Sequence, residues 1–281
     1  MSRSLRQRGA VVIVAMLIVA VAATAAGFML EQQDMSVRQF EAGRDYEQAR
    51  WILKGGTHWA RSILAEDARA TGVDHGGELW ASGLPPTDVE SGTLSGEISD
   101  QQGLFNLNNL VRNGKPSPSD IAALKRMLQA IGLRAELADA MAEGIDATRP
   151  LLDIGELAGR RGVDAEAIAR LRQYATALPL RTPVNVNTAP PEVLVAIVEG
   201  LTLPEALVLA KSRSAAPMRN RDEFLARLRR DLSASVEDIS VESRFFLVSG
   251  RAKIGKADVR MQALLQRAGA GLPAIVWQRM S

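Results

Sequence analysis

The apolar residues are most concentrated near the N-terminus, where residues 9–30 form a run without a charged side chain. From Ala10 this run is about 21 residues long, roughly the length of a helix that crosses the hydrocarbon core of a bilayer. Three arginines and no acidic residue precede the run, and Glu31 and Asp34 follow it. Because basic residues remain on the cytoplasmic side of a membrane, the pattern predicts a transmembrane helix over residues 10–30 with the rest of the chain outside the cytoplasm.

A cleaved secretory signal peptide is the alternative explanation of this run. Its apolar core would be shorter, and loop-like sequence would follow the cleavage site. Here the helical pattern continues, and no proline or turn cluster interrupts it before Gly55-Gly56, so we expect one helix that leaves the membrane and continues. We attribute the glycine pair to close approach of a sheet, in preference to a hinge. Small or apolar residues at three- and four-residue spacing predict the face that packs on this sheet: Tyr46, Ala49, Leu53, Gly56, Ala60 and Ile63.

The rest of the chain shows two kinds of pattern. Short alternating segments predict strands at 78–81, 92–99, 245–250, 259–266 and 274–277. The last three are expected to form an antiparallel meander, with a turn at 253–256. Residues 116–235 follow the helical period, with helices expected from 117 and at 137–145, 154–159, 165–174, 191–198, 204–212 and 221–228. The prediction is an α+β fold in which a long N-terminal helix packs on an antiparallel sheet and an all-α body is inserted between the strands.

One distinctive motif occupies residues 100–110, Asp-Gln-Gln-Gly-Leu-Phe-Asn-Leu-Asn-Asn-Leu. Gly103 is suited to a turn. Phe105 and Leu107 are expected to be buried in the sheet, and the side chains of Asn106 and Asn108 are expected to bond the local backbone. We interpret the motif as a structural connector between a strand and a loop, with a binding site as the alternative.

A second motif occupies residues 184–194, Val-Asn-Val-Asn-Thr-Ala-Pro-Pro-Glu-Val-Leu. Proline is favoured in the first turn of a helix, so Pro190 and the proline after it predict a helix start. Asn187 or Thr188 is expected to cap that helix. This Asn185-to-Pro190 element is similar to one found both in a secretion family and in helix-hairpin-helix DNA-binding proteins.

Binding to DNA is therefore a rival function of a different class. A DNA-binding hairpin needs two glycines that let backbone N–H groups reach a phosphate, whereas here Thr202 replaces the second glycine. Glu199 and Glu205 bracket the loop with negative charge, which disfavours phosphate contact. Arginines between Arg213 and Arg230 keep the alternative open, although such a cluster is usually a solvated face. We expect a structural hairpin and no nucleic acid partner.

Composition excludes several classes of site. The 281 residues carry a formal net charge of +2 and no cysteine, so disulfides and thiolate metal sites are absent. The two histidines, His58 and His75, have no third ligand that the sequence identifies. No nucleophile–histidine–acid set or glycine-rich phosphate loop is recognisable, so we expect a protein that is not an enzyme.

The junction at Gly9 and Ala10 resembles the leader of type IV pilins and type II secretion pseudopilins. Val14 stands at the fifth position after this junction, where most pilins have glutamate, and an apolar residue there is characteristic of K-type minor pseudopilins. Together with the motifs at 100–110 and 184–194, these features make the chain similar to the K-type minor pseudopilins of type II secretion systems. The resemblance implies cleavage after Gly9 by a prepilin peptidase and N-methylation of Ala10.

The resemblance further implies a location and partners. The protein is expected in the bacterial inner membrane as a single-pass protein with its C-terminal part in the periplasm. Its implied partners are the I- and J-type minor pseudopilins, the major pseudopilin, the prepilin peptidase, the inner-membrane assembly platform and exported substrates. It would act at the tip of the pseudopilus, where it would initiate or cap the filament and support protein export.

The fold that the resemblance implies is pilin-like, with a SAM-like or helix-hairpin-helix-like insertion. The expected division is a cleaved leader at 1–9, a transmembrane helix at 10–30, a first pilin-like part at 31–113, the helical domain at 114–240 and a C-terminal meander at 241–281. The family is also known for calcium in its helical domain. Calcium prefers six to eight oxygen ligands, and the short link at 147–151 offers too few, so we expect no cofactor.

Overall fold

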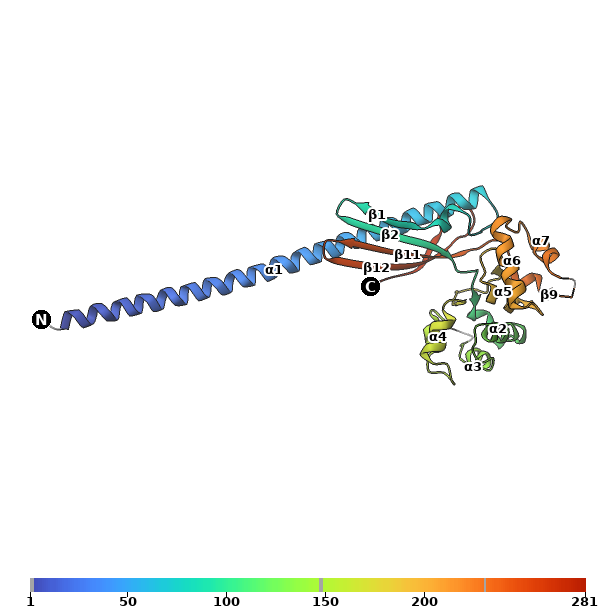
Figure 1. Cartoon of the computed structure of the whole chain (residues 1–281), viewed down its shortest axis with the longest axis horizontal. Coiled ribbons are helices and arrows are strands. Elements are labelled where there is room, and N and C mark those ends of the chain that lie inside the picture. The colour runs from blue at the N-terminus through green and yellow to red at the C-terminus, as the bar shows by residue number, and fades with distance from the viewer. Residues whose placement is uncertain (1–2, 147–148, 230) are drawn as a thin grey trace.

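A single N-terminal helix dominates the shape of the molecule. The computed structural model describes residues 3–146, 149–229 and 231–281, and helix α1 (Arg3–Ala70) extends over 68 of these residues without a break (Figure 1). At 1.5 Å per residue this helix is about 100 Å long. Its segment Val12–Met29 is long and apolar enough to span a membrane, and its side chains are exposed. The second half of α1 lies against the rest of the protein, as Figure 1 shows.

The sheet has five antiparallel strands in the order β1-β2-β11-β12-β13. A three-ten helix, η1 (Leu79–Ser82), leads from α1 into β1 (Leu84–Val89) and β2 (Gly92–Asp100). The chain returns much later as β11 (Phe245–Ile254), β12 (Ala257–Gln266) and β13 (Ala274–Met280). Since β11 pairs with β2, everything between these two strands is an insertion into the sheet. The expected C-terminal meander is confirmed.

The predicted stripe on α1 is the face that meets the sheet. Ala49 and Leu53 pack with apolar side chains of β11 and β12, and Ala60 and Leu64 form a second cluster around Phe246. A Cβ atom added to Gly56 would lie 3.9 Å from the side chain of Leu94, which supports close approach of the sheet. Tyr46, which the pattern assigned to this face, is exposed to 42% and does not belong to either cluster.

The inserted residues form a helical body with its own core, in which Leu124, Met141, Leu171, Leu194 and Phe224 are buried. Several helices begin at a capping residue: the side chain of Asp164 accepts from the backbone N–H of Ala167, and that of Asn220 accepts from Glu223. The helices are α2 (Pro118–Ala130), α3 (Leu137–Glu143), α4 (Ala165–Leu171), α5 (Pro191–Ile197), α6 (Leu203–Ala215) and α7 (Arg221–Arg227), with three-ten turns η2 (Leu107–Leu110), η3 (Ile154–Leu157) and η4 (Val236–Asp238).

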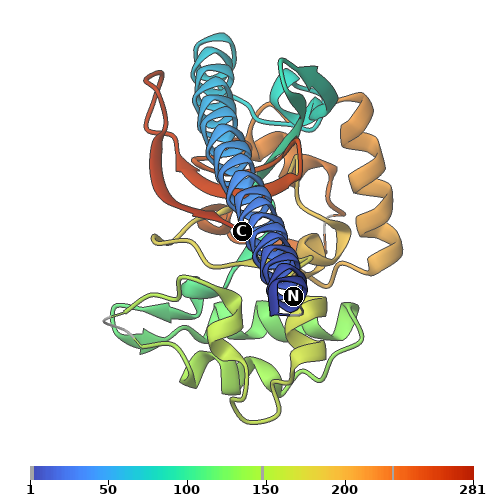
Figure 2. The same ribbon diagram turned by 90° about the vertical axis from the view of Figure 1, so that its left-hand side faces the viewer.

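Short strand pairs join these helices. They are β3 (Phe105–Asn106) with β6 (Ala175–Thr176), β7 (Val184–Asn185) with β10 (Ile239–Ser240), β4 (Val111–Arg112) with β5 (Lys115–Pro116), and β8 (Val198–Glu199) with β9 (Ser233–Ala234). Seen from the N-terminal end of α1, these helical elements lie below and to the right of α1, while the C-terminal strands pass behind α1 and extend to its left (Figure 2).

Tyr46 is exposed, and the inserted body expected to be all-α contains short strand pairs; three further sequence predictions are wrong in detail. Residues 78–81 are not a strand, because Leu79–Ser82 forms η1 and turns Trp80 onto Phe246 at a ring distance of 5.3 Å. Residues 154–159 form only a three-ten turn. Phe105 and Leu107 are buried, but in the core of the helical body and not in the sheet. An apolar residue near a strand end indicates burial without specifying which core receives it.

Candidate functional site

The two motifs predicted from the sequence meet where the helical body joins the sheet. At their contact lies Asp100, the last residue of β2. One oxygen of its carboxylate, Oδ1, accepts the backbone N–H of Gln102 at 2.7 Å. The other oxygen, Oδ2, accepts from Asn185 at 2.9 Å, from Thr188 at 2.5 Å and from Ser243 at 2.7 Å. One buried carboxylate therefore joins both motifs to the segment that enters β11.

Asn185 is fully buried and connects three segments of the chain. Its side-chain nitrogen also donates to the backbone oxygen of Asp74 at 3.1 Å and lies 3.0 Å from the hydroxyl of Ser243. Its side-chain oxygen accepts from the backbone of Asn187 at 3.0 Å. The backbone N–H of Asn185 donates to the oxygen of Gln102 at 2.8 Å. A buried amide with this many partners fixes the relative positions of these segments.

Gly103 and Thr188 are in direct contact at this junction. A Cβ atom on Gly103 would lie 2.6 Å from Oγ1 of Thr188 and 3.0 Å from its backbone carbon. Gly103 also stands in the predicted turn. The expectation that Asn187 or Thr188 caps α5 is wrong: Pro190 occupies the N-cap position and no side chain caps the helix. The hydroxyl of Thr188 donates to Asp100 instead.

The other asparagines hold loops of the helical body together. Asn187 exchanges two hydrogen bonds with the backbone of Met218, at 2.9 Å each. The side chain of Asn106 accepts from the backbone of Asn108 and from that of Leu178, each at 3.1 Å, so its bonds are only partly local. Asn108 reaches the more distant segment at Leu151. These contacts are those of a structural connector.

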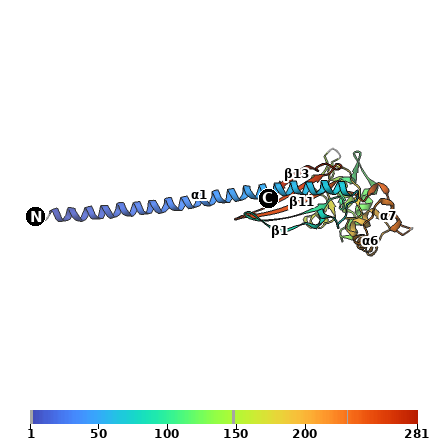
Figure 3. The same ribbon diagram turned by 90° about the horizontal axis from the view of Figure 1, so that it is seen from above.

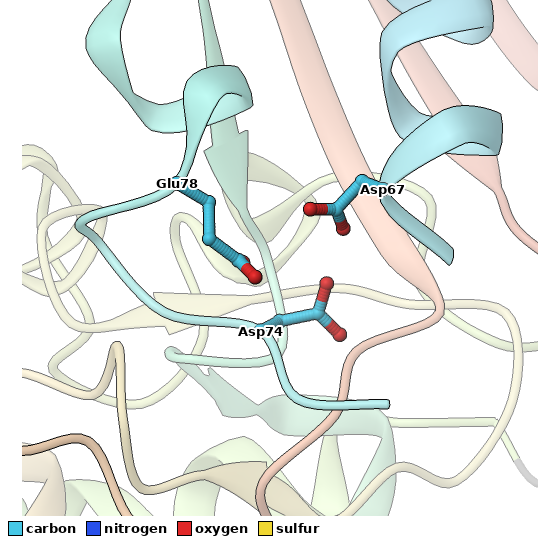
Figure 4. Close-up of side chains that lie close together, drawn as sticks. All are labelled: Asp67, Asp74 and Glu78. Carbon is cyan, nitrogen blue, oxygen red and sulfur yellow. The ribbon is translucent and has the colours of Figure 1, made fainter. Parts of the chain in front are cut away.

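An acidic cluster lies on the sheet side of the junction. Carboxylate oxygens of Asp67, Asp74 and Glu78 come within 4.8 Å of one another, and Figure 4 shows the three side chains converging. The guanidinium of Arg267 pairs with Asp67 at 3.0 Å and with Asp74 at 2.5 Å. Glu78 accepts from the indole N–H of Trp80 at 2.8 Å. The chain thus supplies its own cation to this cluster, and the cluster binds the end of α1 to the end of β12.

Burial disturbs the ionisation of these groups. The pKa of Asp67 is raised to about 6, first by its removal from water and then by the neighbouring charges of Glu78 and Asp74, against the opposing effect of Arg267. Burial also raises the pKa of Asp100, although hydrogen bonds from Thr188, Ser243 and the backbone of Gln102 oppose the shift. Burial alone would lower the pKa of Arg267, but its contacts with Asp74 and Asp67 raise it.

The carboxylates beside the link at 147–151, where family resemblance raised calcium, do not fit a calcium site. Asp153 is paired with Arg172 at 2.5 Å and lies 3.4 Å from Arg279, and its side chain accepts the backbone N–H of Gly155. Glu156 accepts backbone N–H groups at 152 and 153. These carboxylates already serve partners of the chain itself, and residues 147–148 of the link lie outside the described residues.

The hairpin between α5 and α6 presents carboxylates and not a phosphate site. Gly200 has a positive φ of 81°. Glu205 accepts from the backbone and hydroxyl of Thr202 and pairs with Arg229 at 3.0 Å. Of the arginines considered for DNA, Arg213 donates to the backbone oxygen of Val186 at 2.6 Å and burial lowers its pKa to about 10. Arg230 lies outside the described residues.

The remaining sequence-predicted positions lie in α1. Gly9 and Ala10 belong to its helical backbone. Val14 is exposed on the apolar segment. Sequence reasoning missed the roles of Asp74, Ser243 and Arg267, which lie in loop-like or polar stretches. A polar residue directly beside a predicted strand end is the one available indication for Ser243.

These features define a class of protein: a chain with an apolar N-terminal helix of membrane-spanning length, an antiparallel sheet packed on that helix and a helical body inserted between two central strands. The inserted body is held by a buried polar network centred on Asp100.

Comparison with known proteins shows one consistent similarity. The family model of type II secretion system (T2SS), protein K matches residues 184–242. The type II secretion system protein K of Pseudomonas aeruginosa is 28% identical over 303 residues, which cover 94% of this chain and 90% of that protein. That of Klebsiella pneumoniae is 29% identical over 307 residues, covering 94% of each. A chain in the crystal structure of the GspK-GspI-GspJ complex from enterotoxigenic Escherichia coli shares the fold, with a TM-score of 0.72, 22% identity, and coverage of 86% of this chain and 99% of that one.

The chain is therefore similar over 94% of its length to type II secretion system protein K, in agreement with the resemblance to K-type minor pseudopilins that its sequence motifs show. The part of the chain matched by the family model contains Asn185, Asn187, Thr188 and Pro190.

Proposed function

We propose that this protein occupies the tip of the pseudopilus in a complex with the I- and J-type minor pseudopilins. There it initiates or caps the filament and supports export of folded proteins across the outer membrane. The observation that carries the proposal is the position of the helical body, which lies at the end of α1 remote from the N-terminus and is fixed to the sheet through Asp100 (Figure 1). A bulky body held rigidly at that end would leave no room for a further subunit above it.

The solved complex from enterotoxigenic Escherichia coli supports the choice of partners, since that structure holds GspK together with GspI and GspJ. We propose the same two partner types here, together with the major pseudopilin, the prepilin peptidase and the inner-membrane assembly platform. The role is structural and not catalytic. Exported substrates would contact the helical body.

The membrane arrangement belongs to the same proposal. We infer a single pass through the bacterial inner membrane, with the C-terminal part in the periplasm and a leader removed after Gly9. We also propose a pilin-like fold with a SAM-like or helix-hairpin-helix-like insertion. The contacts of Phe105 with the helical core support a first boundary of this insertion before Phe105, ahead of the boundary at residue 114 expected from the sequence. For the second boundary of the insertion we propose residue 240, as expected from the sequence.

Co-purification tests the proposal. The full chain, tagged at its C-terminus, is co-expressed with the I- and J-type minor pseudopilins of the same organism and purified in detergent. We expect all three proteins to elute as one complex, and we expect deletion of the gene to abolish pseudopili and export together. Normal assembly and export without this chain would refute the proposed role.

A further inference from the structure

The last strand of the sheet, β13, has a free edge with a defined hydrogen-bonding pattern. Arg260 and Ser281 exchange both backbone hydrogen bonds, at 2.8 and 3.0 Å. In an antiparallel pair such exchanges alternate with pairs whose N–H and C=O groups point away from each other. Arg279 lies opposite Gln262 and therefore points its backbone groups towards β12. The backbone groups of Gln278 and Met280 consequently point away from the sheet.

No other part of the described chain satisfies these outward groups. The hydrogen bonds among described residues include none to the backbone of Gln278 or Met280. Figure 3, viewed from above, places β13 and β1 on opposite sides of α1. The edge is seven residues long, about 23 Å at the usual rise of a strand. It begins with two half-exposed apolar side chains, Ile275 and Val276.

The opposite edge of the same sheet is blocked. Strand β1 contains Pro85 and Pro86, which have no N–H group, and its register with β2 shifts between Leu84 and Thr87. Soluble proteins protect exposed sheet edges with prolines, irregular pairing or charges because an open edge recruits other strands. β13 contains neither proline nor glycine, and its own register shift with β12, between Leu264 and Leu265, lies before the regularly paired stretch from Trp277 to Met280. The two edges are therefore not equivalent, and β13 is the one able to accept a strand.

The side of α1 next to β13 is basic. Arg61 donates to the backbone oxygen of Pro273, immediately before β13, at 2.7 Å. His58 and Lys54 lie three and seven residues before Arg61 and so share this side of the helix. Neither Lys54 nor Arg61 forms an ion pair with an acidic side chain among the described residues; Lys54 instead lies 4.3 Å above the ring of Trp51. A strand added at this edge would meet positive charge on its α1 side.

We propose that the β13 edge binds an extended, acidic segment of a partner pseudopilin by strand addition. Main-chain hydrogen bonds to Gln278 and Met280 provide the binding, and carboxylates facing Lys54 and Arg61 provide the selectivity. This inference rests on the proposed function for the identity of the partner, an I- or J-type minor pseudopilin. It adds the surface on this chain and the kind of segment that the surface accepts.

The test removes one outward N–H group. Gln278→Pro deletes a donor that does not pair with β12, whereas Gln278→Ala keeps it. Each variant of the full chain is purified in detergent, its melting is compared with that of the wild type, and its affinity for the separately purified I- and J-type proteins is measured. We expect Gln278→Ala to bind like the wild type and Gln278→Pro to lose about tenfold or more in affinity for one partner. If a folded Gln278→Pro variant binds both partners with the affinity of the wild type, the inference is overturned.

Hydrogen exchange provides a second measurement on the unaltered protein. The amides of Gln278 and Met280 should exchange quickly in the free chain and slowly in the complex. A complex that forms while these amides stay unprotected contradicts strand addition. If the wild-type chain binds neither protein, the proposed function itself fails. If the wild-type chain alone forms a dimer that Gln278→Pro abolishes, the occupant is a second copy and the proposed partner is wrong.

The basic side of α1 is tested separately. Lys54→Glu should weaken the same partner's binding several-fold at low salt, with a smaller effect at high salt, because the attraction is screened. Lys211→Glu is the matched control, since Lys211 is an exposed lysine on α6 in the helical body. Equal effects of the two substitutions would contradict an acidic segment at this edge.

Discussion

At the scale of single residues, the junction is held by side chains that are small, polar and buried. Asp100 and Asn185 fill most of their hydrogen-bonding capacity inside the protein, so the cost of burying them is offset by their partners. A buried polar group without a hydrogen-bond partner would lower the free energy of unfolding by about 1–3 kcal/mol. This is why the motifs contain amides and hydroxyls at positions where an apolar residue would otherwise stabilise a core.

Gly103→Ala tests the closeness of this packing. The added methyl group would lie within 2.6 Å of the Thr188 hydroxyl, and the backbone carbon behind that hydroxyl at 3.0 Å has little freedom to move. We expect a loss of about 1–3 kcal/mol in the free energy of unfolding, measured by urea denaturation of the full chain in detergent. Gly43→Ala is the control, because no atom lies within 4 Å of its added Cβ. An unchanged stability for Gly103→Ala would show that Thr188 can rotate away.

Asp67 gives a prediction about pH. Its pKa of about 6 in the folded protein exceeds the ordinary 3.8, so the folded state holds the proton more tightly than the unfolded state. The contribution of this group to stability therefore rises as the pH falls from about 7 towards 4, and it is lost as the pH rises through 6. Asp67→Asn mimics the protonated form. We expect this variant to be more stable than the wild type at about pH 7.5 and to lose that advantage by about pH 4.5, measured by denaturation at each pH.

A stability difference that stays constant between these two pH values would contradict this assignment. Arg267 remains paired with Asp74 in the variant, so the loss of one carboxylate leaves the arginine with a partner. The comparison of variant with wild type also cancels the titration of groups that do not interact with Asp67, such as Asp100.

At this scale, only interactions between residues close together in the chain could be predicted from the sequence. The motif around Gly103 predicted a turn, and a turn is present. The bond from Asn185 to Asp100 joins residues 85 apart, and that from Ser243 joins residues 143 apart. Periodicity and capping rules describe neighbours within a few positions, so they could not bring these groups together. They also misassigned Thr188 to a helix cap because its true acceptor is distant in the chain.

At the scale of elements, contact with α1 determines the conformation of the β11–β12 hairpin. Its turn contains Gly255 with a φ of 52°, and a Cβ atom there would overlap the carboxylate of Asp45 on α1. The stripe on the helix and the strand alternation were enough to predict that the helix and the meander pack together. They did not predict β1, because its two prolines conceal a strand that is paired on one side only.

Gly255→Ala tests two constraints on this turn, the left-handed backbone of residue 255 and the contact of its Cβ position with Asp45. The left-handed backbone costs about 1–2 kcal/mol for alanine, and the overlap with Asp45 adds to that cost. Gly269→Ala, at a φ of 76° with no atom within 4 Å, should show the backbone cost alone. Adding Asp45→Ala to Gly255→Ala should recover part of the loss. Thermal melting of these variants measures the coupling, and equal losses for Gly255→Ala and Gly269→Ala would exclude a steric contact with α1.

At the scale of the whole molecule, one helix joins the membrane segment to the sheet and the attached helical body without an interruption. Gly55 and Gly56 lie inside this helix and leave it continuous. The sequence predicted this continuity correctly because no helix-breaking proline occurs between residues 9 and 70.

Processing of the N-terminus is the prediction that belongs to this scale. Co-expression with a prepilin peptidase should give a mature chain that begins at N-methylated Ala10, as intact mass and N-terminal sequencing would show. Gly9→Val should block the cleavage and leave the periplasmic fold unchanged. A wild-type chain that still begins at Met1 or Ser2, beside a peptidase active on another pilin, would refute pilin-type processing.

The insertion of the helical body between β2 and β11 also governs the order of folding. The backbone N–H of Gln101 donates to the oxygen of Phe245 at 2.9 Å, so the two ends of the insertion are neighbours. Closing β2 onto β11 across an unfolded loop of residues 101–244 is a slow, non-local step. Once the helical body has folded, its ends already lie together and that search is short. Pulse-labelled hydrogen exchange should therefore find amides of α2 and α5 protected before those that join β2 to β11.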